Sequence, residues 1–329
     1  MDYFAYVDNF KKTENIGTQL IQGTPSLTKA SFTILIPTYH RSELLKQALD
    51  SALKQNNFDD FEVLVLDNEP QRNDETENLL RNYSNDNLLY YKNDQNLGMA
   101  GNWNRGFLLS QSFWTILLHD DDIMAPHFLS TVSKYLFMDK ELAILKPINQ
   151  RFNKITPSFK KEDQKKVCSQ LHFKDFMLNC AVGAPTNIVF NRDVVISLGG
   201  FNQDFYPAYD YVFAARCAEV YKVYFLPITL GGYRVSSNES LNIDTMNKYF
   251  SNRFSIRNEV MKKMNIPCFA IKLIQSITYQ KAVDETNDYY SYNYQLEIDN
   301  YNFWNFPKPI LGLLQFIFFK AMFILKKIV

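Results

Sequence analysis

The chain has 329 residues, of which 46% are hydrophobic and 21% charged, so it can bury a sizeable core in one large or two small domains. Its 35 basic and 35 acidic side chains cancel, which excludes a nucleic-acid partner held by bulk charge, and the 15% aromatic content excludes a disordered chain. The four cysteines lack the spacing of a zinc site and the density of a disulfide framework, and we expect them to be reduced and structural: Cys168, Cys180, Cys217 and Cys268.

The two ends of the chain differ in character. Residues 1–30 lack the basic start and the continuous apolar stretch of a signal peptide, which predicts a protein that stays in the cytoplasm. Residues 310–325 are rich in Leu, Ile and Phe, but Gly312, Gln315 and Lys320 interrupt them. This stretch is therefore too short and too interrupted for a membrane-spanning helix.

Strand and helix patterns alternate over the first 120 residues. Apolar runs predict four strands, at 32–37, 61–66, 88–91 and 113–118. Apolar residues at helical spacing predict helices between them, over 44–53, around 79–80 and up to 109. Strands separated by helices in this way indicate a parallel sheet covered by helices.

After about residue 150 the regular alternation fades. The charged stretch 154–166 predicts a mobile loop. Beyond it the patterns predict strands at 187–190 and 222–230, a helical turn at 193–198 and a helix at 209–220.

Polar residues follow three of the predicted strands, and a parallel sheet binds ligands beyond the carboxyl ends of its strands. Thr38 and Tyr39 follow the first strand, Asp67 follows the second, and three consecutive aspartates, 120–122, follow the fourth. Adjacent carboxylates at the end of an apolar strand repel one another, so a cation should compensate them. Mg²⁺ or Mn²⁺ would suit, and either commonly keeps phosphate oxygens in its shell. The alternative is a solvated acidic turn that caps a helix near Pro126.

Four segments, taken in order, resemble the inverting glycosyltransferases of family 2. They are Ile36-Pro-Thr-Tyr-His-Arg41, Val65-Leu-Asp-Asn68, Asn96-Leu-Gly-Met-Ala-Gly-Asn-Trp-Asn-Arg-Gly106 and Leu118-His-Asp-Asp-Asp-Ile-Met-Ala-Pro126. The resemblance covers about residues 31–235. It implies an α/β fold of the GT-A type, a Rossmann-like, mostly parallel sheet flanked by helices.

The resemblance also implies a domain organisation. Residues 1–30 would be an N-terminal extension and 31–240 the GT-A domain, with a nucleotide-binding half to about residue 150 and an acceptor half after it. Residues 241–329 would form a helical C-terminal region.

Carried over to this sequence, the resemblance implies a nucleotide pocket lined by Pro37, Thr38, Tyr39 and Arg41. Asp67 would accept a hydrogen bond from the base, commonly uracil in this family. A further set would lie near the nucleotide: Asn96, Asn102 and Arg105. The alternatives are that Thr38 and Tyr39 are ordinary loop residues, that Asp67 caps the next helix, and that the asparagines form turns.

Within the aspartate run, the alignment implies that Asp121 binds the metal, that Asp122 lies alongside as a second ligand, and that Asp120 lies nearer the ribose. His119 stands where many family members have the first aspartate of the motif. It is either a pocket residue or a buried structural histidine.

Two further residues match the family pattern. Asp210 would be the general base that deprotonates the acceptor hydroxyl; alternatively it caps a helix. Arg234 would bind the diphosphate through its guanidinium; alternatively it forms a surface ion pair.

The tail 307–329 is amphipathic with a wide apolar face and lysines on its polar side. It predicts peripheral contact with the inner face of the cell membrane beside a lipid-linked acceptor, or packing on the enzyme or on a second subunit.

The predicted function is metal-dependent transfer, with inversion, of a sugar from a nucleotide diphosphate, with UDP expected, to a glycan or lipid-linked acceptor in surface polysaccharide synthesis. Two rivals remain open. One is a metal-dependent nucleotidyltransferase or phosphohydrolase, and the other is a catalytically silent subunit that binds nucleotide sugar.

Overall fold

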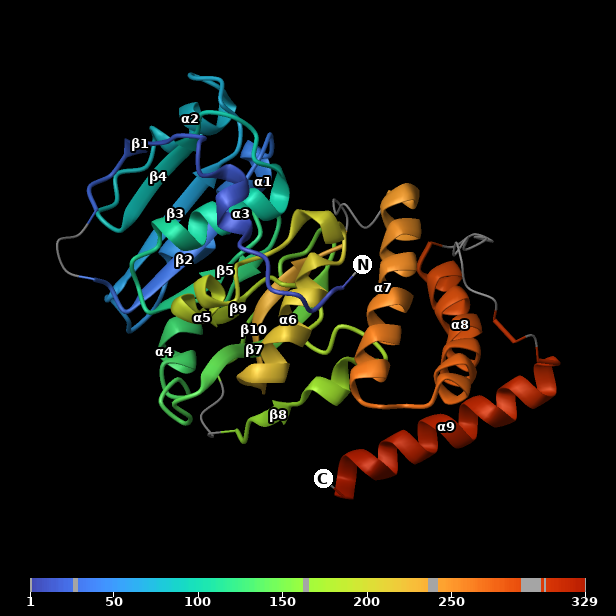
Figure 1. The fold of residues 1–329 in the computed structure, drawn as a ribbon. Helices are drawn as coiled ribbons and strands as arrows, with labels where there is room; N and C mark the ends of the chain where they lie inside the picture. The colour runs from blue at the N-terminus through green and yellow to red at the C-terminus, as the bar shows by residue number, and fades with distance from the viewer. Residues whose placement is uncertain are drawn as a thin grey trace. The chain divides into compact units, whose positions relative to one another are not determined.

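A mostly parallel sheet of ten strands forms the centre of the first of two units, Met1–Leu241, in the part of the chain that the structure describes. The structure is a computed structural model and describes residues 2–25, 29–161, 166–235, 242–290, 303–304 and 306–328. The strands follow the order β1-β4-β3-β2-β5-β9-β7-β10-β6, and β8 pairs with β10 (Figure 1). Their bounds are β1 Thr18–Gln22, β2 Phe32–Thr38, β3 Phe61–Asp67, β4 Leu88–Asn93, β5 Trp114–Leu117, β6 Ile123–Met124, β7 Leu142–Phe152, β8 Ser169–Leu171, β9 Ile188–Asn191 and β10 Lys222–Arg234.

Most of the strands run in one direction. β2 pairs in parallel with β3 and β5, β3 pairs in parallel with β4, and β7 pairs in parallel with β10. β9 lies antiparallel between β5 and β7, so these two strands also share a direction. β1, β6 and β8 are antiparallel to their neighbours. The carboxyl ends of β2, β3 and β5 therefore meet at one edge of the sheet.

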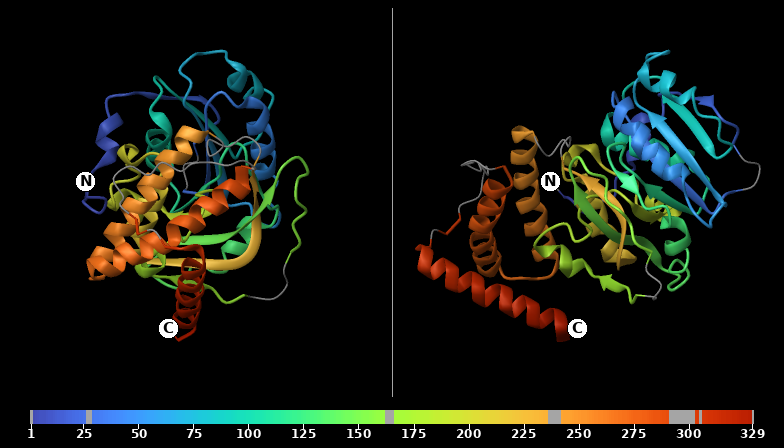
Figure 2. Two further views of the ribbon diagram at one scale, coloured as in Figure 1. Left: turned by 90° about the vertical axis from the view of Figure 1, so that its right-hand side faces the viewer. Right: turned by 180° about the vertical axis from the view of Figure 1, so that it is seen from behind.

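Helices cover both faces of this sheet (Figures 1 and 2). Ile34 of β2 belongs to the same core cluster as Leu45 and Leu49 of α1. Leu35 instead approaches α3 at Gly106, where an added Cβ would lie 2.4 Å from Leu35 Cδ1. Since successive side chains of a strand point to opposite faces, α1 and α3 cover opposite faces. The helices of this unit are α1 Ser42–Leu53, α2 Glu75–Leu80, α3 Gly98–Leu109, α4 Phe128–Val132, α5 Arg192–Ser197 and α6 Tyr209–Val220.

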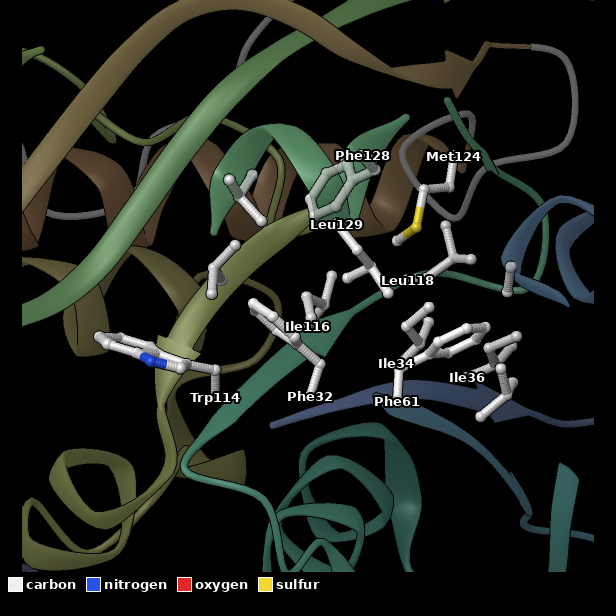
Figure 3. Packing of buried hydrophobic residues seen from close by; sticks show 14 of the residues in the cluster. Phe32, Ile34, Ile36, Phe61, Trp114, Ile116, Leu118, Met124, Phe128 and Leu129 are labelled. Atoms are coloured by element: carbon white, nitrogen blue, oxygen red, sulfur yellow. The ribbon is translucent and has the colours of Figure 1, made fainter. Parts of the chain in front are cut away.

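The core on the α1 face joins β2, β3, β5 and α4. Figure 3 shows its side chains, among them Ile34, Phe61, Ile116 and Phe128, packed together. All seven residues of β2 are buried because both faces of the strand are covered. Each fully buried Leu, Ile or Phe side chain contributes about 1.5–3 kcal/mol, which explains why a continuous apolar run predicted this strand correctly.

The N-terminal segment belongs to the same unit. β1 pairs with β4 at the edge of the sheet, and Asn9 donates a backbone hydrogen bond to the Gly199 carbonyl (3.0 Å). The sequence patterns predicted no strand in residues 1–30 and none over Leu142–Phe152, where β7 passes through residue 150. Of the predicted loop 154–166, residues 162–165 lie outside the described residues.

The second unit, Asn242–Val329, is helical where it is described. Its helices are α7 Ile243–Lys263, α8 Cys268–Tyr290 and α9 Lys308–Ile328. Tyr279 of α8 stacks on Phe303 with ring centroids 4.3 Å apart, and Gln315 of α9 donates to the Ile277 carbonyl (3.0 Å). α9 exposes several apolar side chains: Ile310, Leu313, Phe316 and Ile317. Among the described residues, every helix is too short or too polar to span a membrane.

Candidate active site

The aspartate run lies in a turn between β5 and the short strand β6. β6 pairs antiparallel with Gly231 and Gly232 of β10. A Cβ at Gly231 would lie 2.2 Å from Asn149 Oδ1, and one at Gly232 would lie 2.7 Å from Ile123 Cγ1. Side chains therefore do not fit at these two positions. Gly232 therefore allows β10 to approach β6 closely, and Gly231 leaves room for the Asn149 side chain of β7.

The ends of two strands, β2 and β10, supply the contacts of the aspartates, which themselves follow β5. Thr38, at the end of β2, donates to Asp120 Oδ2 (2.8 Å). Arg41 Nη1 lies 3.1 Å from Asp121 Oδ2 and 3.5 Å from Asp120 Oδ1. At the end of β10, the Arg234 backbone N–H donates to Asp122 Oδ1 (2.7 Å). Arg234 Nε donates to the backbone carbonyl of Asp121 (2.7 Å). The structure thus gathers Thr38, Arg41, Arg234 and the three aspartates.

Burial makes this cluster electrostatically costly. All three aspartates are less than 10% exposed. Burial raises the pKa of Asp120 to about 7, although Arg41 opposes the shift. It also raises the pKa of Asp121 and of Asp122, and for Asp122 the neighbouring Asp121 charge adds to the increase. The chain itself does not fully compensate these carboxylates, so a bound cation would stabilise them.

His119, Asp121 and Asp122 fit a divalent cation. One possible ligand atom from each lies within 4.8 Å of the others. Asp122 Oδ2 and His119 Nε2 are buried and have no hydrogen-bond partner in the described part of the chain. Burial lowers the pKa of His119 to about 3, so its imidazole is neutral and able to act as a ligand. An imidazole with two carboxylates suits Mn²⁺, which accepts both nitrogen and oxygen.

Asp210 occupies the first turn of α6 and is half-buried. Burial raises its pKa to about 7, while backbone N–H groups of residues 210 and 211 oppose the shift. Trp103 links this helix to the aspartate turn, because its ring lies 5.4 Å from the His119 ring and 5.2 Å from the Tyr209 ring. A carboxylate with a pKa near neutrality is suited to accept a proton.

Sequence reasoning missed Lys146, which lies within the otherwise apolar start of β7. It is buried and donates to the carbonyls of Ala184 (3.1 Å) and Thr186 (3.3 Å). Burial lowers its pKa to about 8, whereas Cys180 and Asp122 act in the opposite direction. A lysine inside an apolar run was the signal that could have identified it.

Asp67, which is expected to accept a hydrogen bond from the base, lies at the end of β3 inside the protein. Its carboxylate is fully buried and accepts hydrogen bonds from Lys92 Nζ (2.6 Å), the Tyr90 hydroxyl (3.0 Å) and the Glu69 N–H (3.0 Å). Lys92 also contacts Asp74 (2.9 Å). Asp67 is the counter-charge of a buried lysine, and its oxygens are already engaged.

The asparagine-rich segment mainly builds the start of α3. Asn96 Oδ1 accepts from Asn68 Nδ2 and from the Gly98 N–H, both at 2.8 Å. Asn102 is buried and donates to the Leu66 carbonyl at the end of β3 (3.2 Å). These contacts support the loops behind the site.

Arg105 is directed to the N-terminal segment, and the structure does not bring it to the aspartates. It donates to the Thr13 carbonyl (2.7 Å) and to the Thr18 hydroxyl. Pro37 is buried at the end of β2, and Tyr39 is exposed beside His40.

Comparison with known proteins identifies the family. The profile described as "Glycosyl transferase family 2" matches residues 33–199, which are 167 of the 329 residues. The chain belongs to glycosyl transferase family 2. As a member of this family it is a glycosyltransferase, and the expectation drawn from the four motifs is confirmed.

Several relatives of this family 2 member bear related names. An uncharacterized glycosyltransferase of Methanocaldococcus jannaschii is 24% identical over 223 residues, covering 65% of this chain and 74% of the relative. The abequosyltransferase RfbV of Salmonella typhimurium is 32% identical over 105 residues, 31% of each chain. The GalNAc(5)-diNAcBac-PP-undecaprenol beta-1,3-glucosyltransferase of Campylobacter jejuni is 30% identical over 102 residues, 30% of this chain and 32% of the relative. The match therefore spans about a third of these last two enzymes.

Two solved structures support the GT-A fold of this family 2 domain. S. aureus TarS, residues 1–349 with UDP, has a TM-score of 0.53 at 15% identity, covering 80% of this chain and 78% of that one. The mannosyltransferase PcManGT from Pyrobaculum calidifontis, with GDP-Man and Mn²⁺, has a TM-score of 0.51 at 16% identity, covering 75% and 68%. The predicted GT-A fold is confirmed.

Proposed function

We propose that this family 2 member transfers a sugar, with inversion, from a nucleotide diphosphate to a hydroxyl of a glycan or lipid-linked acceptor in surface polysaccharide synthesis. The observation that carries the proposal is the buried aspartate cluster, in which Asp122 Oδ2 and His119 Nε2 have no hydrogen-bond partner among the described residues. TarS with UDP and PcManGT with GDP-Man and Mn²⁺ support a donor of this class. We take a UDP-sugar as the first donor to test.

Each part of the cluster has a role in this reaction. His119, Asp121 and Asp122 hold a divalent cation, with Mn²⁺ as first choice and Mg²⁺ as second. When bound, the cation supplies positive charge to the departing diphosphate. Thr38 and Tyr39 line the nucleotide side, where Asp120 faces the ribose. The guanidinium of Arg234 binds diphosphate oxygens.

Asp210 acts as the general base. It accepts the proton of the acceptor hydroxyl while that oxygen forms a bond to the anomeric carbon. The bond from the anomeric carbon to the diphosphate oxygen breaks on the opposite face, so the products are the inverted glycoside and a nucleoside diphosphate. The pKa of Asp210, raised to about 7 by burial, allows it to take up a proton near neutral pH.

The test is thermal-shift and turnover measurement with UDP-, GDP-, CMP- and dTDP-sugars and Mn²⁺ or Mg²⁺. We expect one donor to stabilise the protein in a metal-dependent way. Asp210→Asn should still bind this donor but lose about 10²–10⁴-fold in turnover, the usual contribution of a general base. Asp193→Asn, at an exposed carboxylate in the first turn of α5, is the matched control and should change neither.

Analysis of the products distinguishes glycosyl transfer from the two alternative functions, a phosphohydrolase and a silent binding subunit. Release of a nucleoside diphosphate with the sugar supports glycosyl transfer. Release of a nucleoside monophosphate with a sugar phosphate would instead identify a phosphohydrolase. Binding without turnover in the wild type, with every acceptor offered, would identify a silent subunit.

We also propose that α9 binds a membrane surface peripherally, beside a lipid-linked acceptor. Its exposed apolar side chains and Lys320 support this, as does the Campylobacter jejuni relative whose name includes an undecaprenol-linked substrate. Leu313→Ser combined with Phe316→Ser should reduce flotation with anionic vesicles. Unchanged flotation of this variant, or loss of a dimer in light scattering, would favour packing on a second subunit.

A further inference from the structure

Arg41 bridges two carboxylates of the aspartate cluster. One guanidinium nitrogen, Nη1, lies 3.1 Å from Asp121 Oδ2 and 3.5 Å from Asp120 Oδ1. The two carboxylate side chains are 7% and 9% exposed, whereas the Arg41 side chain is 30% exposed. The arginine therefore enters a buried acidic cluster from the solvent side.

Asp121 also belongs to the group that fits a divalent cation, together with His119 and Asp122. The guanidinium and a divalent cation would thus compete for the same carboxylate. Two positive charges a few ångströms apart repel each other, and the repulsion is stronger beside buried groups than in bulk water. Full engagement of Asp121 by the cation therefore requires Arg41 to move away from it.

The contacts of Arg41 allow such a movement. Its backbone carbonyl is fixed, because it accepts hydrogen bonds from the N–H groups of Leu44 and Leu45 in the first turn of α1. Its guanidinium, by contrast, contacts Asp120 and Asp121, and among the described residues it has no further hydrogen bond. The side chain can turn towards solvent without moving the helix.

Arg234 contacts the same cluster, but more interactions hold its guanidinium than hold that of Arg41. Its guanidinium donates to the carbonyls of Asp121 (2.7 Å) and Asn153 (3.3 Å) and to Gln47 Oε1 (2.7 Å), and it lies 4.5 Å from the centre of the Phe152 ring. Three hydrogen bonds and a ring hold it in place. The two arginines therefore differ in freedom of movement.

We propose that Arg41 is an exchangeable counter-cation: it holds Asp120 and Asp121 together when no metal is bound, is displaced from Asp121 by the metal, and then binds a phosphate oxygen of the donor. The proposal rests on the metal and donor of the proposed function. A guanidinium suits phosphate oxygens because it presents several donors in one plane.

This exchange couples metal and donor binding. Metal alone must break the Arg41 contacts without compensation, so it binds weakly. A donor that accepts the released guanidinium restores those contacts, so it tightens metal binding, and metal tightens donor binding by the same factor.

The experiment measures Mn²⁺ affinity from the electron paramagnetic resonance signal of free Mn²⁺, with and without UDP. The variants are Arg41→Gln, Arg41→Lys and the matched control Arg72→Gln, an exposed arginine paired with Glu77. We expect Arg41→Gln to bind Mn²⁺ alone about tenfold more tightly than the wild type, and the tightening caused by UDP to shrink by about tenfold. Arg41→Lys, which keeps the charge, should lie between the two, and Arg72→Gln should match the wild type.

The outcomes distinguish failure of the Arg41 exchange from failure of the metal site. If all proteins bind Mn²⁺ with the same affinity and the same response to UDP, or if Arg41→Gln binds Mn²⁺ alone more weakly, the exchange is overturned and the metal site stands. If no protein binds Mn²⁺ with or without UDP, the metal site of the proposed function is overturned, and the exchange with it. Circular dichroism melts establish that each variant is folded.

Discussion

Asp67 ends β3 and the aspartates 120–122 follow β5, two parallel strands that lie on either side of β2, but the chain stabilises these carboxylates in different ways. Asp67 receives a buried lysine at 2.6 Å, a tyrosine hydroxyl and a backbone N–H. Asp122, equally buried, retains an oxygen without a hydrogen-bond partner among the described residues, whereas burial raises the pKa of both carboxylates. Both positions are strand ends with an acidic residue, so the sequence pattern alone does not separate them.

These two environments indicate where a ligand is expected to bind. Around Asp67 the protein supplies its own cation, Lys92, so this buried charge is paired within the chain. At the aspartate turn the protein supplies only part of the positive charge that would compensate the carboxylates. A bound ligand would supply the rest. A buried charge that the chain does not pair is therefore a better guide to the site than an acidic residue at a strand end.

Removing Lys92, the buried cation that pairs with Asp67, should lower the free energy of unfolding most. Lys92→Met leaves the Asp67 carboxylate buried without its cation, which typically costs about 3–5 kcal/mol of the free energy of unfolding. Chemical denaturation of the metal-free protein measures this loss. Lys46→Met, which removes an exposed lysine paired with Asp50 on α1, should cost less than about 1 kcal/mol. Equal losses in the two variants would remove the distinction between the two regions.

A smaller effect, with a different signature, is expected for Asp121→Asn. This change removes one of three neighbouring buried carboxylates, so repulsion falls while the Arg41 contact is weakened. We expect the free energy of unfolding of the metal-free protein to change by less than about 1 kcal/mol. The stabilisation by Mn²⁺ should disappear, as thermal melts with and without metal will show. A loss as large as that of Lys92→Met would mean that this cluster, too, is mainly structural.

The third expected effect is a pH dependence. Burial raises the pKa of Asp120 from 3.8 to about 7, so the folded protein holds a proton that the unfolded chain releases above about pH 4. The free energy of unfolding of the metal-free protein should therefore fall, through Asp120, as the pH rises from about 4 to about 7. Binding of Mn²⁺ needs the carboxylates without protons, so its stabilising effect should grow over the same range.

His119, whose pKa is lowered to about 3, contributes in the opposite direction below about pH 6.5, so the comparison needs a reference. Subtracting the melts of Asp120→Asn from those of the wild type isolates the contribution of Asp120. We expect the metal-free wild type to lose stability relative to this variant between pH 5 and pH 7. A constant difference across that range would contradict the raised pKa.

The sequence patterns predicted six strands, β2, β3, β4, β5, β9 and β10, and missed β1, β6, β7 and β8. β2 and β3 are buried on both faces and appear as continuous apolar runs, whereas β1 is an edge strand whose Thr18 and Gln19 carry no such pattern. Lys146 and Asn149 interrupt β7, because they hold the backbone around Thr186. Edge strands and polar contacts within a strand remove the periodicity on which prediction depends.

The site was predictable as far as strand ends could be aligned. Thr38 and the three aspartates follow directly from that argument, and the structure brings them together. The burial of Asp67 depends on Lys92, 25 residues away, and the position of Arg105 depends on Thr13 and Thr18 in the N-terminal segment. Such long-range pairings leave no trace in local sequence patterns.

The contact between Trp103 and His119 gives the molecule an optical reporter of its own. The indole is 3% exposed and lies 5.4 Å from the imidazole ring, while Trp114 and Trp304 are the other two tryptophans of the chain. Indole fluorescence is quenched by a paramagnetic ion a few ångströms away and is not quenched in this way by a diamagnetic one. Titration of the unlabelled protein with Mn²⁺ and with Mg²⁺ therefore distinguishes arrival of an ion at His119 from binding elsewhere, by the loss of emitted light.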